Sequence, residues 1–344
     1  MKTLSIMQTH CTTQQRSSQA NRVRRVVTHP NQLAGIVVLL ISALLFSGCS
    51  TPDLKPFSDA SKTLSTSVKT GGEMAIKPLA KTPLWVNNTL VQAGDPNHPY
   101  KDLQTQWATR VKAMDAVLVY SASLQAINEA SAHRKENAKA LVGSVQQLAA
   151  AVPGYGAAFN KAGDLIVQGL AVTVEVKAWH DMRRAVASAD PAVQLVAKGL
   201  KQDLQSIARV FEAPLNDQIT RFGAATRPVI RLEEALRQKR DVQRTAVEGD
   251  PADTARGNEL TRLEGLYATA AADLNQMRAE RAKIEEAVAQ GKDFFANSVA
   301  AVDAWADAHS ELMKAFEENR MPNFTLLAAR AEELSELVNQ FKKK

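Results

Sequence analysis

Cysteine, aromatic residues and strand-like patterns are all scarce in this sequence. Only two cysteines, Cys11 and Cys49, and 5% aromatic residues occur in 344 residues. Stretches in which Val, Ile, Thr or Tyr alternate with polar residues at a period of two, typical of half-buried strands, are hard to find, whereas Ala is abundant. Because Ala has the highest helix propensity, the composition favours helices over sheets.

Sequence signatures of catalysis and of metal binding are also missing. The six histidines are dispersed, with no His-Glu-x-x-His spacing, and neither Gly-x-Ser-x-Gly nor a phosphate-binding glycine loop occurs. Paired carboxylates such as Glu233-Glu234 are sequence neighbours, which point about 100° apart on a helix and form a solvated face. His309 is expected to be a hydrogen-bonded core histidine. We therefore expect no enzyme, no metal site and no cofactor.

Acid is absent from the first 52 residues, where basic residues precede an apolar run. Five Lys and Arg residues lie before position 26, and residues 33–46 are apolar except for Gly35 and Ser42. The small residues Ser47 and Gly48 follow, and then Cys49. The order basic, apolar, small is typical of a secretory signal, and the run is shorter than the ~20 residues of a membrane span.

The tetrapeptide Phe46-Ser47-Gly48-Cys49 resembles the lipobox of bacterial lipoproteins, with Phe46 where Leu is usual. The resemblance implies a signal peptide at 1–48, cleavage before Cys49, and a lipid anchor on Cys49 that carries acyl chains such as palmitate. Ser50, by the same resemblance, is compatible with delivery to the outer membrane, facing the periplasm. The implied partner is therefore a membrane, reached through the lipid anchor.

Removal of the leader changes both the charge and the cysteine content. Five of the 42 basic residues lie in the leader, which leaves 37 basic against 36 acidic residues from Cys49 onward. A nearly neutral chain argues against nucleic acid as a partner. Cys11 leaves with the leader, so an acylated Cys49 leaves no free thiol in the mature protein.

Proline divides the mature chain into two parts. Residues 50–100 hold six of the thirteen prolines, together with Ser, Thr, Lys and the pair Gly71-Gly72. We interpret 49–100 as a flexible lipidated tether, with one short amphipathic piece at 57–68 and an apolar cluster at 84–86 that docks on the rest. Residues 101–344 are expected to form a helical bundle domain.

The bundle is expected to consist of long helices. Asp-Pro pairs at 190–191 and 250–251 predict helix starts, because Asp is a good N-cap and Pro suits the first helical position. The expected helices are 101–150, 156–189, 191–247, 252–319 and 323–342.

The fourth helix carries a 3.5-residue repeat that predicts a coiled-coil-like seam. Thirteen of seventeen seam positions are apolar; the seventeen are Leu260, Leu263, Tyr267, Ala270, Leu274, Met277, Arg281, Ile284, Val288, Gly291, Phe295, Ser298, Val302, Trp305, His309, Leu312 and Phe316. The predicted fold class is therefore all-α: an elongated bundle of long, coiled-coil-like helices.

The third helix combines internal prolines with a basic face. Its apolar phase runs through Pro214 and Pro228, which predicts one kinked helix. Its possible contacts to lipid head groups are Arg221, Arg227, Arg231, Arg237, Arg240 and Arg244. The alternative, which we favour, is a solvated face whose arginines pair with acids of the next helix.

Three functions remain open from the sequence. We favour a structural or protein-interaction role in the bacterial cell envelope, with a protein partner or self-association. One alternative is a membrane-shaping protein, since kinked helices with a basic face are similar in general form to BAR domains. The other is a helical pore-forming or toxin-like protein that uses residues 140–174, which carry only two charges.

Overall fold

The computed structural model describes residues 52–86, 89–129 and 178–343, with isolated residues between 136 and 147. Cys49, the leader and the centre of the apolar segment 140–174 lie outside the described residues. Residues 51–344 belong to one structural unit.

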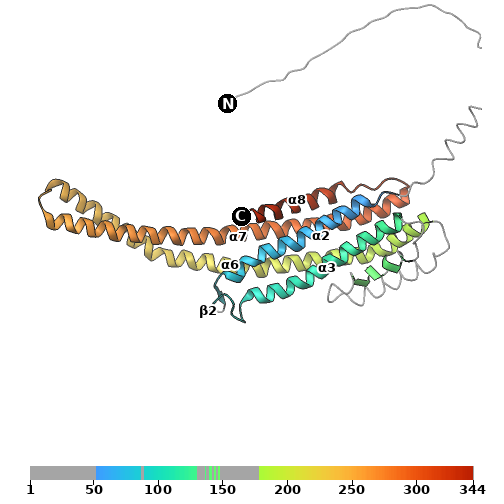
Figure 1. Ribbon diagram of the computed structural model, residues 1–344, viewed down its shortest axis with the longest axis horizontal. Helices are drawn as coiled ribbons and strands as arrows, with labels where there is room; N and C mark the ends of the chain where they lie inside the picture. Colours follow the sequence, from blue (N-terminus) through green and yellow to red (C-terminus); the bar gives the residue numbers. More distant parts are fainter. Residues whose placement is uncertain are drawn as a thin grey trace, which may run out of the picture. The chain divides into compact units, whose positions relative to one another are not determined.

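The described chain is all-α apart from one small hairpin, which confirms the predicted fold class (Figure 1). The long helices α6 and α7 pack against each other along their lengths, and α2 contacts α3, α7 and α8. The elements in chain order are α2 (Lys55–Ile76), the 3-10 helix η1 (Lys77–Lys81), β1 (Leu84–Val86), β2 (Thr89–Val91), α3 (Pro99–Glu129), α6 (Ala178–Gly249), α7 (Thr254–Glu318) and α8 (Thr325–Lys342).

The predicted seam runs along α7 as expected. None of its seventeen positions is exposed, and from Gly291 to Phe316 all eight are buried. Phe211 of α6 packs so close to α7 that a Cβ on Gly291 would lie 2.2 Å from its ring. The 3.5-residue repeat therefore identified the buried stripe of α7 correctly.

Helix α6 is a single helix of 72 residues, and the predicted helix start at Asp190-Pro191 is wrong. The side chain of Asp190 does not cap a new helix there; it binds His309 of α7. Pro214 and Pro228 also lie inside α6, which confirms one continuous helix across both prolines. A Pro in a helix removes one backbone hydrogen bond, and packing against α7 offsets that loss.

The predicted tether at 49–100 is wrong for its described part, because residues 55–76 form α2 in the centre of the bundle. The amphipathic piece predicted at 57–68 is shorter than the helix, because the buried stripe of α2 continues through Gly71 and Gly72 to Ala75 and Ile76. The Gly and Ser residues of this segment predict a flexible chain. In the fold they allow close approach, since a Cβ on Gly72 would overlap the ring of Trp107 at 1.8 Å.

Two other helices begin a few residues from their predicted starts. Helix α3 begins at Pro99, and α7 begins after Asp253, whose carboxylate accepts from the backbone N–H of Arg256 at 3.1 Å. Asp250, the predicted cap, lies in the turn before it. The cluster at 84–86 does dock as predicted: β1 pairs antiparallel with β2 and contacts α6, and Leu84 is fully buried.

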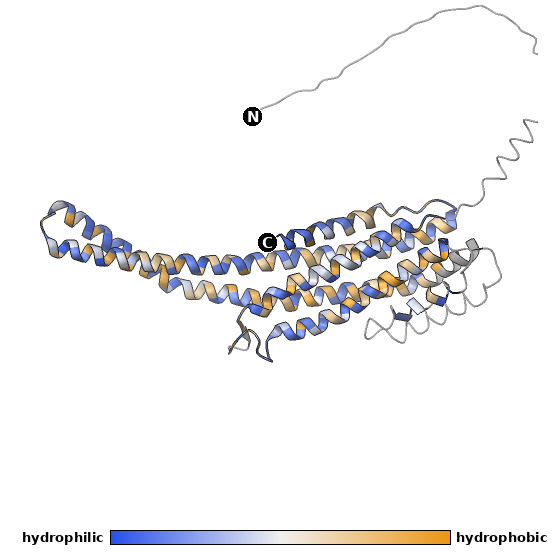
Figure 2. Ribbon diagram, viewed as in Figure 1, coloured by the Kyte–Doolittle hydropathy of each residue, from blue (hydrophilic) through white to orange (hydrophobic). Residues whose placement is uncertain are grey.

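The few aromatic residues are concentrated in the bundle core. Trp107 packs edge-on against Phe294 and Phe295, at 6.4 and 6.3 Å between ring centroids. Elsewhere in the core, the ring centroids of Tyr120 and Trp305 lie 6.3 Å apart. Figure 2 shows apolar residues lining the inner faces of the helices. Each such side chain contributes about 1.5–3 kcal/mol when fully buried.

The distal parts of α6 and α7 form an arm in which no other described helix takes part. We define the arm as residues 223–281, which comprise the end of α6, the turn at 250–253 and the start of α7. Among its described residues, only Thr226, Leu263, Ala270 and Leu274 are buried. Two helices alone cannot enclose a core, so most arm side chains face solvent.

Candidate functional site

A buried polar cluster joins three helices within the bundle. The His309 side chain on α7 is 0% exposed; its Nδ1 lies 2.9 Å from Asp190 Oδ1 on α6, and its Nε2 lies 2.5 Å from Tyr120 Oη on α3. The same Asp190 oxygen accepts from Ser310 Oγ at 3.0 Å and from Gln194 Nε2 at 3.4 Å. These contacts confirm His309 as a hydrogen-bonded core histidine.

The cluster gives both ring nitrogens of His309 a hydrogen-bond partner. Nδ1–H donates to Asp190, and Nε2 accepts from the Tyr120 hydroxyl, so both ring nitrogens have partners. Desolvation opposes the charged form of Asp190, but the hydrogen bond and the electrostatic attraction of His309, with hydrogen bonds from Ser310 and Gln194, outweigh it and hold the Asp190 pKa below its usual value. Burial, together with the nearby Asp190 charge, raises the pKa of Tyr120 well above its usual value.

An Asp–His–hydroxyl chain is also the arrangement of a catalytic triad, in which the carboxylate fixes the imidazole tautomer. Here the hydroxyl that donates to the imidazole belongs to Tyr120, which is 0% exposed, and the Phe57 ring packs 6.4 Å from the His309 ring. The cluster therefore serves as a specific crosslink among α3, α6 and α7. No sequence pattern points to this crosslink, because Tyr120, Asp190 and His309 lie 70 to 189 residues apart.

Half of the six candidate arginines on α6 are engaged by neighbouring side chains. Arg221 pairs with Asp217 at 2.7 Å, and its guanidinium lies 4.6 Å from the Trp85 ring centroid. Arg244 binds Glu264 of α7 at 2.9 Å.

Arg240 follows the same pattern. It binds Asp241, and its guanidinium covers the ring of Tyr267 on α7 at 4.2 Å. The remaining three, Arg227, Arg231 and Arg237, are exposed. Of the three engaged arginines, only Arg244 pairs with an acid of the next helix, whereas Arg221 and Arg240 pair with acids of α6 itself.

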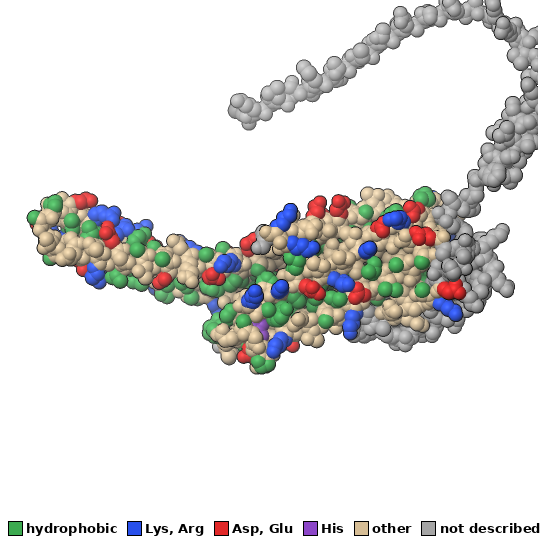
Figure 3. Space-filling model, in the orientation of Figure 1, with side chains coloured by type: hydrophobic (Ala, Val, Ile, Leu, Met, Phe, Trp, Pro, Cys, Tyr) green, Lys and Arg blue, Asp and Glu red, His purple; other side chains and the backbone are tan. Residues whose placement is uncertain are grey.

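The arm as a whole has no excess of positive charge. Residues 223–281 contain ten Lys and Arg and ten Asp and Glu. Glu234 lies seven residues after Arg227 and Asp241 four after Arg237, so acids share the face of the exposed arginines. Figure 3 shows both signs interspersed over the visible side of the arm. A balanced face gives anionic head groups little electrostatic attraction.

Some of the other residues that the sequence singled out lie in the described part of the chain, and some lie outside it. Cys49, the lipidation candidate, and the centre of the pore-forming candidate 140–174 lie outside the described residues. His98 is buried, and its Nε2 lies 2.9 Å from the carbonyl of Thr82. In the described part of the chain, no group of three His, Cys, Asp or Glu residues could hold a metal ion. None of the described helices is long and apolar enough to cross a membrane.

Comparisons with protein families, curated proteins and solved structures found no match for this chain.

Proposed function

We propose that the mature protein is a lipoprotein of the bacterial cell envelope, anchored through Cys49, with a structural or protein-interaction role and without catalysis. The observation that carries the proposal is the order of features before the bundle. A basic, acid-free segment is followed by the apolar run 33–46 and by Ser47-Gly48-Cys49. The folded chain then starts at once, with α2 at Lys55.

The architecture supports an interaction role more than a site for small molecules. The polar cluster around His309 is used internally as a crosslink between helices. The arm, by contrast, exposes most of its side chains, among them Leu232 at 53% and Val242 at 72%. Its balanced charges favour a protein partner, or a second copy of this chain, over an anionic lipid surface.

The anchor is tested by replacing Cys49→Ala in cells that are fed radiolabelled palmitate. The unchanged protein is expected to incorporate label and to remain with membranes through detergent-free washes, and Cys49→Ala to lose both properties. Ser47→Thr, next to the cleavage site, is the matched control and should keep them. A Cys49→Ala protein that still matures and stays membrane-bound refutes lipidation at Cys49.

The interaction role is tested by photocrosslinking in cells. A photoreactive amino acid at Val242 on the arm is compared with one at Val119, an exposed position of α3. The arm position is expected to yield a discrete crosslinked product, which mass spectrometry identifies. Equal, diffuse crosslinking from both positions contradicts a partner on the arm.

A further inference from the structure

The described chain begins at the end of the bundle that also carries the loop between α7 and α8. We call residues 319–324 the α7–α8 loop. Asn128, near the end of α3, donates from Nδ2 to the carbonyl of Pro52 at 2.9 Å. The Phe57 ring lies 5.5 Å from the ring of Phe324. Figure 1 shows the start of α2 and this loop at the same end of the bundle.

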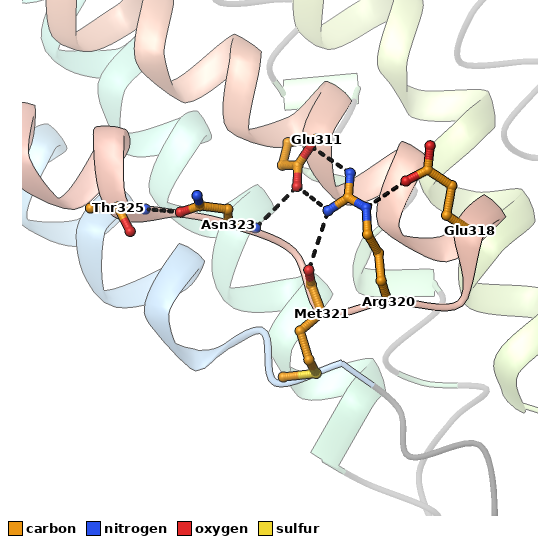
Figure 4. Close-up of polar contacts among 6 residues, drawn as sticks. All are labelled: Glu311, Glu318, Arg320, Met321, Asn323 and Thr325. Atoms are coloured by element: carbon orange, nitrogen blue, oxygen red, sulfur yellow. Dashed lines mark hydrogen bonds and ion pairs between the residues drawn. The ribbon is translucent and has the colours of Figure 1, made fainter. Parts of the chain in front are cut away.

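Hydrogen bonds centred on Arg320 hold the α7–α8 loop in one shape (Figure 4). The Arg320 guanidinium binds both carboxylate oxygens of Glu311 and reaches Glu318 Oε2 at 2.5 Å. Its Nη1 also donates to the carbonyl of Met321 at 3.3 Å, and the N–H of Asn323 donates to Glu311 Oε1 at 3.1 Å. The loop is therefore fixed by bidentate and backbone contacts.

This fixed loop presents apolar side chains to the outside. Met321 is 59% exposed, and its side chain points away from the Arg320 network (Figure 4). Leu326, in the first turn of α8, is 55% exposed. Glu311 and Glu318 both pair with Arg320, so the loop offers no unpaired arginine to an anionic surface.

We propose that this end of the bundle, with Met321 and Leu326 foremost, lies against the lipid surface to which the protein is anchored. The inference rests on the proposed lipidation of Cys49. A mature chain that starts at Cys49 has three peptide steps before Pro52, and these span at most about 11 Å. So short a connection keeps the end that holds Pro52 beside the head groups.

The exposed side chains of Met321 and Leu326 suit a lipid surface that the protein contacts by inserting apolar groups and not by pairing charges. Met and Leu side chains gain free energy when they move from water into the boundary between head groups and acyl chains. The lipid anchor supplies the affinity, and the two side chains set the orientation. Helix α7 ends at this end of the bundle, at Glu318, and its 65 residues span about 100 Å, so its first turns, in the arm, lie far from the membrane.

The test uses mature, lipidated protein reconstituted in vesicles of phosphatidylethanolamine and phosphatidylglycerol. Because an acylated Cys49 leaves no free thiol, Met321→Cys introduces a single site for an environment-sensitive fluorophore. Val242→Cys, exposed on the arm, is the matched control. Some of the lipids carry a head-group spin label, which quenches only fluorophores near the surface.

The label at position 321 is expected to shift to the blue and to be quenched several-fold more than the label at 242. Vesicles without phosphatidylglycerol should give the same result, since insertion does not need anionic lipid. Flotation of the protein with the vesicles but equal quenching at both positions overturns the orientation alone. Labelling of the unsubstituted mature protein reveals a free Cys49 and overturns the anchor, and this inference with it.

Discussion

At the scale of single residues, Asp190 determines how α6 meets α7. One of its oxygens accepts hydrogen bonds from His309, Ser310 and Gln194, and through His309 it reaches the hydroxyl of Tyr120. A buried donor without its partner costs more free energy than an ordinary hydrogen bond contributes, so the cluster is specific for this alignment of the helices.

Replacing Asp190→Ala should lower the free energy of unfolding by about 1–3 kcal/mol, because it leaves the buried Nδ1–H of His309 without an acceptor. Asp307→Ala, two residues from His309 on α7 but exposed, is the control and should change stability by less than about 0.5 kcal/mol. Urea unfolding followed by circular dichroism measures both. Equal effects of the two substitutions would show that the Asp190 hydrogen bonds contribute nothing.

The Asp190 cluster also predicts an acid dependence of stability. The pKa of Asp190 in the folded protein lies below its ordinary value of about 3.8, because its hydrogen bonds and its attraction to His309 favour the carboxylate over the opposing desolvation. A depressed carboxyl pKa adds stability above the unfolded pKa, and this contribution is lost as pH falls through the folded pKa.

Below pH 3.8 the unsubstituted protein should therefore lose stability more steeply than Asp190→Asn, which has no carboxyl to protonate. Thermal melts at a series of pH values from neutral to strongly acidic measure both slopes. Parallel curves for the two proteins would contradict the role of the Asp190 carboxylate.

At the scale of elements, α2 packs closely because it carries glycine at two contact positions. A Cβ on Gly71 would lie 2.2 Å from the Phe294 ring, and one on Gly72 would lie 1.8 Å from Trp107. The hydroxyl of Ser65 donates to the carbonyl of Met114 at 2.9 Å, which also needs a short side chain. The small residues of α2 thus bring its backbone close to α3 and α7.

Substituting Gly72→Ala should destabilise the bundle by about 1–3 kcal/mol, because the large, buried Trp107 ring must move. Gly265→Ala is the matched control: no atom lies within 4 Å of the added Cβ, so the better helix former should stabilise α7 by up to about 1 kcal/mol. Chemical unfolding of both variants measures the change in the free energy of unfolding and therefore its sign. A stabilising Gly72→Ala would show that α2 does not approach α3 as described.

The elements also show where sequence reasoning succeeds. The seam of α7 was predictable because a regular 3.5-residue spacing of apolar residues survives in any packed helix pair. Helix α2 was predicted only as a short piece at 57–68, because Gly and Ser are weak helix formers and only tertiary contacts with Trp107 and Phe294 explain their presence. The continuity of α6 through Pro191 was missed for a similar reason: the partner of Asp190 is 119 residues away.

At the scale of the whole molecule, the arm and the bundle should be separable. Residues 227–277 form the outer part of the arm. Among the described residues, the side chains of this part make their tertiary contacts between α6 and α7. Replacing residues 227–277 by a short Gly-Ser turn should leave the thermal midpoint of the bundle nearly unchanged.

A deletion of α8 at 321–344 is the contrasting variant. It uncovers Phe294 and one face of α2, so it should abolish cooperative melting. Calorimetry distinguishes the two deletions. If the arm deletion also abolishes the transition, the arm contributes to the core of the bundle.

The contact between α2 and α8 joins the first and the last described helices of the chain. A Cβ on Gly71 would lie 2.6 Å from Val338, and Phe341 packs 6.1 Å from Phe294. Because α2 ends at Ile76 and α8 begins at Thr325, this contact cannot form during synthesis until α8 has left the ribosome. Contacts so distant in sequence form late in folding. Until then, the face of α2 that packs on α8 stays uncovered in the nascent chain.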